Sequence, residues 1–190
     1  MKKLFLALFL CIISTFIYAA PFGLSMGMTI EEIAEQCENE PTHIKDDIYL
    51  VQPIKSHPVF SYYAVYVNEK TGLYQIRAIS SSITTNKYGT ELQNTFNNVK
   101  DRIAKTYGKP KIIDTLDPES IFKGNEYWFY TLKEGSRQLS AIWGEKSKLA
   151  DNLVTVALDC AAESYDKGQL ILYYYFDNTS SVEDEQDEVF

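Results

Sequence analysis

The chain has 190 residues, of which 45% are hydrophobic and 23% charged, and its formal net charge is −8. This composition is too apolar for a disordered chain, and nine glycines and six prolines exclude a collagen-like one. The negative charge argues against nucleic-acid binding, because a protein that contacts phosphates needs a basic surface. The length predicts a single domain.

The first 19 residues have the pattern of a secretory signal peptide. Lys2 and Lys3 precede an apolar run over residues 4–17, and the small residue Ala19 follows. The run is shorter than the stretch of about 20 residues that spans a membrane. We therefore predict cleavage after Ala19 and export, to the periplasm or beyond the cell, with no membrane span in the mature chain. The alternative is an uncleaved anchor.

Removal of the signal would leave two cysteines, Cys37 and Cys160, in an oxidising compartment where disulfides persist. Cys37 falls on the apolar stripe of a predicted helix, and Cys160 falls on the apolar face of a predicted strand. A Cys37–Cys160 disulfide would close a loop of about 120 residues and stabilise the fold by about 4–5 kcal/mol. The alternative is a pair of buried free thiols.

The first predicted helix begins at a capping-box pattern formed by Thr29 and Glu32. Behind it, Ile30, Ile33 and Cys37 lie on one apolar stripe. Three runs rich in β-forming residues follow. The second and third runs are separated by a turn of hairpin length. The three candidate strands are residues 48–52, 60–67 and 73–83.

The second predicted helix starts at Thr90, where Gln93 completes another capping-box pattern. Gly108 ends it at the position that favours a left-handed residue, and Pro110 follows. The helix has a clear amphipathic stripe, whose members recur at spacings of three or four. They are Leu92, Phe96, Val99, Ile103 and Tyr107.

The remaining sequence completes an α+β domain. A polar stretch, 114–124, precedes a short aromatic helix predicted over residues 125–133. Three further strands complete the prediction. We expect one antiparallel sheet of about five to six strands, with two to three helices, in a single domain over residues 20–177. From residue 178 to 190 the chain is polar and acidic, which predicts a disordered tail. The last three strands are residues 137–143, 153–162 and 169–177.

The sequence predicts no catalytic residue, metal site or cofactor. His43 and His57 lie in loops and lack the spacing of a metal site. The acidic loop with Asp114, Asp117 and Glu119 lacks the central glycine of a calcium loop. Nucleophile elbows, phosphate-binding loops and dinucleotide fingerprints are also missing from the sequence.

Tyrosines are concentrated in the predicted strands. Alternation places Tyr173 and Tyr175 on the face opposite Tyr174. An exposed tyrosine face suits a protein interface, and Arg77 and Arg137 on other strands are candidates to lie beside it. The alternative is that aromatic residues simply favour strands, while the arginines pair with structural carboxylates.

Two resemblances follow from short motifs. Residues 22–29, with their Gly-Met-Thr helix start, resemble the small outer-membrane lipoproteins of the barrel-assembly machinery. Residues 62–176 resemble an uncharacterised family of exported Gram-negative proteins through Lys70–Leu73, Tyr88–Thr90 and Tyr107–Pro110. The resemblances imply export and an α+β fold, and they imply no catalytic residue.

These observations favour an exported, soluble and non-enzymatic binding or interaction protein whose ligand or protein partner is unidentified. One alternative is an acidic inhibitor or host-directed effector that acts on a basic enzyme. A second alternative is a hydrolase with an unrecognised site. The charge argues against nucleic acid as a partner in each case.

Overall fold

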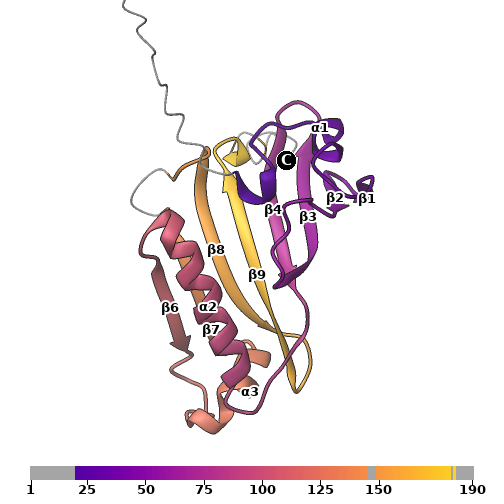
Figure 1. Cartoon of the computed structure of the whole chain (residues 1–190). Helices are drawn as coiled ribbons and strands as arrows, with labels where there is room; N and C mark the ends of the chain where they lie inside the picture. Colours follow the sequence, from indigo (N-terminus) through magenta and orange to yellow (C-terminus); the bar gives the residue numbers. More distant parts are fainter. Residues whose placement is uncertain (1–19, 145–148, 181, 183–190) are drawn as a thin grey trace, which may run out of the picture.

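The computed structural model describes residues 20–144, 149–180 and 182 (Figure 1). The predicted signal peptide lies outside the described residues, as do position 181 and positions 183–190 of the predicted tail. Within the described part, three α-helices accompany one antiparallel sheet of nine strands. The α+β class is therefore confirmed, whereas the predicted count of five to six strands is too low.

The strands follow the order β1-β2-β3-β4-β9-β8-β7-β6 across the sheet, and β5 pairs with one end of β9. The predicted hairpin at residues 60–83 is confirmed as β3 and β4. The strand bounds are β1 (Thr42–Lys45), β2 (Ile48–Val51), β3 (Phe60–Asn68), β4 (Gly72–Ser80), β5 (Ile83–Thr84), β6 (Lys111–Leu116), β7 (Arg137–Trp143), β8 (Leu153–Ala162) and β9 (Lys167–Phe176).

The sheet is built from two halves, each with a helix followed by four antiparallel strands. Strand β5 follows the first run, and a 3₁₀ turn and a short helix over residues 125–133 lie between β6 and β7 in the second. In the first half, a short helix precedes the antiparallel run β1 to β4, and in the second a long helix precedes the run β6 to β9. The final strand of each half, β4 and β9, pair with each other in the middle of the sheet (Figure 1). One continuous sheet therefore joins both halves.

The first helix, α1 (Ile30–Ala34), begins at the predicted capping box. The backbone N–H of Glu32 donates to Thr29 Oγ1 at 3.3 Å, and the N–H of Thr29 donates to Glu32 Oε2 at 2.9 Å. Ile33 is fully buried. The helix ends before Cys37, whose N–H donates to the carbonyl of Ala34 in a tighter turn.

The long helix, α2 (Thr90–Tyr107), buries four of the five residues of the predicted apolar stripe, leaves Tyr107 half-buried and ends at Gly108 as expected. The capping box predicted at Thr90 is absent, because Gly89 occupies the N-cap position and Thr90 is already helical. Asn86 Oδ1 accepts the N–H of Thr90 instead, at 3.4 Å. The third predicted helix is divided into a 3₁₀ turn, η2 (Asn125–Tyr127), and α3 (Trp128–Lys133).

The hydrophobic core lies against one face of the sheet, which we call the inner face. On β9 its members are Leu170, Leu172, Tyr174 and Phe176, all buried. Leu92 of α2 and Phe129 of α3 approach the start of β9 at Gly168, and α2 and α3 pack across β7 and β8 (Figure 1). The C-terminal half of the inner face is therefore covered by these two helices.

The N-terminal segment covers the inner face in the other half. Residues Pro21–Gly23 form a 3₁₀ turn, η1. The ring of Phe22 packs edge-on against Tyr63 at 4.8 Å and against Tyr174 at 5.8 Å. Leu24, immediately after η1, is fully buried.

The two cysteines of the described residues are free, so the predicted Cys37–Cys160 disulfide is not present. Both contact the core, as the apolar patterns predict. They belong to different parts of it, since Cys37 pairs with Pro53 in the first half and Cys160 pairs with Leu170 on β9. Periodicity shows that a side chain points inward, but it does not show which core residues that side chain will meet.

The described chain continues past β9 in close contact with β4. Asn178 Nδ2 donates to the carbonyl of Thr71 at 3.0 Å, and Thr179 Oγ1 donates to the carbonyl of Tyr74 at 2.9 Å. Val182 is buried. Packed residues are thus found beyond position 177, where the domain was expected to end.

Candidate functional site

The face of the sheet opposite the core, the outer face, carries the side chains that alternate with the core residues. On β9 these include Tyr173 and Tyr175, which lie between buried neighbours and are themselves half-buried. The described helices α2 and α3 cover the inner face, so neither lies over these tyrosines. In Figure 1 both helices lie in front of the sheet, and the outer face points away from the viewer.

Strand register aligns the outer-face side chains in rows that cross the sheet. In the middle row, Ala64 on β3 and Ala157 on β8 flank the larger side chains of Arg77 and Tyr173. The middle row runs through Leu50, Ala64, Arg77, Tyr173, Ala157 and Ile142. The next row contains Tyr66, Gln75, Tyr175 and Thr155.

Arg77 lies between two tyrosine rings at the centre of this face. Its Cζ is 5.2 Å from the ring centre of Tyr66 and 5.1 Å from that of Tyr173. The rings of Tyr173 and Tyr175 stack with their centres 6.0 Å apart and their planes 12° from parallel. Cation–π contacts of this kind contribute about 0.5–2 kcal/mol each and orient the guanidinium. We call Tyr66, Arg77, Tyr173 and Tyr175 the aromatic–arginine cluster.

One hydrogen-bond donor of the cluster lacks an acceptor among the described residues. Arg77 Nε is buried and has no hydrogen-bond partner among the described residues. Burial raises the pKa of Tyr173 and Tyr175, although the charge of Arg77 opposes that rise. Both phenols are therefore neutral at pH 7. A buried donor without a partner costs about 1–3 kcal/mol.

The chemistry of the cluster suits binding. Tyrosine and arginine are the side chains that contribute most often to interface hot spots, because they offer flat contact area together with polar groups. The four side chains provide stacking surface, hydroxyl groups and one positive charge. They do not contain the paired acid and base that general acid–base catalysis requires.

The structure brings Arg77, Tyr173 and Tyr175 together but places Arg137 elsewhere. Arg137, at the start of β7, shares the inner side of the sheet with α3, and its Cζ lies 5.7 Å from the ring centre of Trp128. Its Nη1 donates to Asp114 Oδ1 at 2.9 Å, in a salt bridge. Arg137 therefore pairs with Asp114, which was expected in an acidic loop but lies on β6.

Tyr66 was not among the candidate residues, although it contacts Arg77 as closely as Tyr173 does. Tyr66 lies between Val65 and Val67, which are both buried, so alternation along the strand predicts that its side chain points to the outer face. The sequence does not show that β3 lies next to β4 and that β4 lies next to β9. That non-local pairing is what brings Tyr66 to the cluster.

The described residues contain no cluster of three or more histidine, cysteine, aspartate or glutamate side chains placed to hold a metal ion. None of the helices within the described ranges combines the length and apolar character that crossing a membrane requires. His43 donates to the backbone, with its Nε2 2.8 Å from the carbonyl oxygen of Asp46.

No protein-family model matches the chain. No curated protein matches it at a significant level, and no solved structure does. The resemblances of residues 22–29 and 62–176 therefore stay predictions, and the proposals below depend on geometry and chemistry.

Proposed function

We propose that the protein is an exported, non-enzymatic binding protein that takes a protein partner on the outer face of its sheet. The observation that supports this most directly is Arg77, held between two tyrosine rings with an unpartnered Nε on a face that α2 and α3 leave uncovered. The signal-peptide pattern of residues 1–19 supports export.

The outer face is large enough for a protein. Its middle row crosses six strands, and at about 4.8 Å per strand this spans about 24 Å. A standard interface covers about 800 Å² on each partner. The partner we expect presents a flat, partly apolar surface with a carboxylate or carbonyl oxygen opposite Arg77.

A photo-crosslinking amino acid at position 175 tests this proposal in Gram-negative cells that express the full chain. We expect a discrete adduct with a protein, which is lost when Arg77→Ser is added. The control carries the same crosslinker at Tyr88, which is exposed beside α2, away from the outer face. Equal adducts from both positions, or none from position 175, would contradict the proposal.

A further inference from the structure

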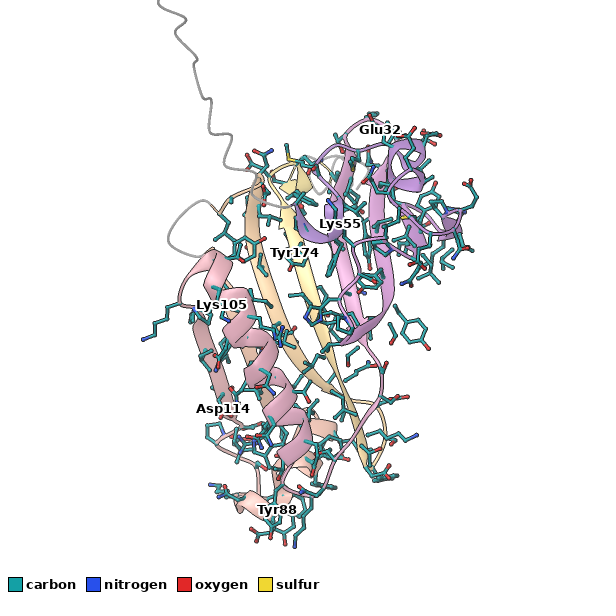
Figure 2. The ribbon with its side chains drawn as sticks, viewed as in Figure 1. Glu32, Lys55, Tyr88, Lys105, Asp114 and Tyr174 are labelled. Carbon is teal, nitrogen blue, oxygen red and sulfur yellow. The ribbon has the colours of Figure 1, made fainter. Side chains whose placement is uncertain are left out.

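A second feature of the molecule is a cavity of about 310 Å³ between the N-terminal segment, α2 and the inner face of β9. In Figure 2, Lys55 and Tyr174 lie close together in this region. The volume is at the lower end of the range of about 300–1,000 Å³ typical of ligand sites. The apolar part of its lining comes from Phe22, Phe60, Val99, Ile103, Leu172 and Tyr174.

The rim of this cavity carries uncompensated positive charge. Lys55 and Arg102 both line it, and among the residues that the structure describes no aspartate or glutamate does. Neither has an ion-pair or hydrogen-bond partner among the described residues. The stem of Lys55 passes over Gly23, where an added Cβ would lie 3.3 Å from Lys55 Cδ, so the lysine is held beside the opening.

His57 adds a third polar group to the rim and is fixed by its neighbours. Its Nδ1 accepts the backbone N–H of Val59 at 3.3 Å, so the neutral ring carries its proton on Nε2. Burial and the nearby charge of Arg102 lower the pKa of His57, which favours this neutral form. Tyr63 Oη accepts the backbone N–H of His57 at 2.9 Å and anchors the loop.

We infer that this cavity binds an amphipathic carboxylate, with its hydrocarbon chain among the apolar side chains and its carboxylate between Lys55 and Arg102. Charge-assisted hydrogen bonds from lysine and arginine to a carboxylate are stronger than neutral ones. The apolar chain gains by leaving water. The charged rim and the apolar interior thus match the two ends of one ligand, and the small volume favours a medium-length chain such as decanoate. This site is distinct from the aromatic–arginine cluster.

Calorimetric titration of the full-length protein with decanoate tests the inference, with decanol and decylamine as uncharged and cationic probes. We expect decanoate to bind more tightly than either. Arg102→Gln and Lys55→Gln should each weaken decanoate binding about tenfold or more, because a hydrogen bond to a charged group is lost. Lys87→Gln is the matched control, since it removes the same charge from a lysine that lies over the ring of Tyr88.

A further variant blocks the cavity without removing charge. Thr106 lines the cavity and is exposed on α2. We therefore expect the Thr106→Trp variant to fold, and its larger side chain to fill the cavity and abolish binding. The inference is overturned if decanoate and decanol bind equally, if none of the probes binds, or if Lys87→Gln weakens binding as much as Arg102→Gln. It is also overturned if decanoate binds only after deletion of residues 183–190, because the occupant would then be the chain's own acidic segment.

Discussion

Gly72 shows how closely two main-chain segments approach each other. Its φ is +71°, and a Cβ there would lie 2.2 Å from the carbonyl oxygen of Gly27. The two segments are tied by a hydrogen bond from the N–H of Gly27 to the carbonyl of Leu73 at 2.9 Å. Neither main chain can move aside as a flexible side chain could.

We therefore expect Gly72→Ala to lower the free energy of unfolding by about 3 kcal/mol, from backbone strain and steric overlap together. Gly135→Ala is the control, because Gly135 has a similar φ of +76° but nothing within 4 Å of its added Cβ. That variant should lose only about 1–2 kcal/mol. Urea denaturation measures both, and equal losses would contradict the steric part of the argument.

The side chain of Tyr107 makes the free energy of unfolding decrease at alkaline pH. Burial, with a smaller contribution from Asp151, raises its pKa to about 12. The pKa is higher in the folded state than in the unfolded one, so the neutral phenol stabilises the fold. This stabilisation is fully present below about pH 10. It is lost as pH rises from about 10 to about 12.

In Tyr107→Phe we expect the midpoint of thermal unfolding to fall less steeply over this pH range than in the wild type. Tyr165→Phe is the control, because that ring is 80% exposed. Differential scanning fluorimetry across the pH series checks both. A Tyr107→Phe profile with the wild-type slope would rule out this residue as the cause.

For Arg77 and Arg137, the sequence indicates the direction of the side chain but not the residues that it contacts. Arg137 shares its parity with Leu139, Ala141 and Trp143, an apolar set, so alternation already indicates the inner side. Arg77 lies between Ile76 and Ala78, which are buried, so alternation indicates the outer side. The direction of each side chain was therefore available. The pairing of β4 with β9, which brings Arg77 to Tyr173, depends on contacts that no local pattern records.

Among the helices, the two threonines with capping-box patterns differ in what they do. Thr29 is a true N-cap for α1, whereas Thr90 lies inside α2 and its hydroxyl donates to Asn86 Oδ1 at 3.2 Å. Thr29→Ala should cost about 1 kcal/mol of stability. Thr90→Ala should cost less than half of that. Chemical denaturation compares the two, and a larger loss at Thr90 would contradict the assigned caps.

The strands that the sequence did not reveal, β1 and β6, lie at the two edges of the sheet. All four residues of β1 are exposed, and β6 buries none of its six. An edge strand with no buried face lacks the alternation of apolar and polar residues on which prediction depends. Strands β8 and β9 have that alternation, and β3 and β4 contain runs of consecutive buried residues. Each of these four strands was predicted to within a few residues. The long predicted strand at 73–83 divides into β4 and β5.

At the scale of the whole molecule, the described residues contain no disulfide between the two halves of the sheet. We expect the same unfolding temperature with and without dithiothreitol. Cys160 should resist alkylation in the folded protein, since burial raises the pKa of its thiol, and both thiols should react in urea without a reductant. A lower unfolding temperature in dithiothreitol, or thiols that stay unreactive in urea, would contradict this description.

The pairing of β4 with β9 also has a consequence for the order of folding. Within each half, at most 20 residues connect neighbouring strands, so their pairing closes loops far shorter than the one between β4 and β9. The pair Gln75 and Tyr175 joins positions 100 residues apart, and closing so long a loop costs more chain entropy. We infer that the two meanders form first and separately and that formation of this central seam limits the folding rate. Because the seam also places Arg77 beside Tyr173, the aromatic–arginine cluster can form only when β4 and β9 have paired.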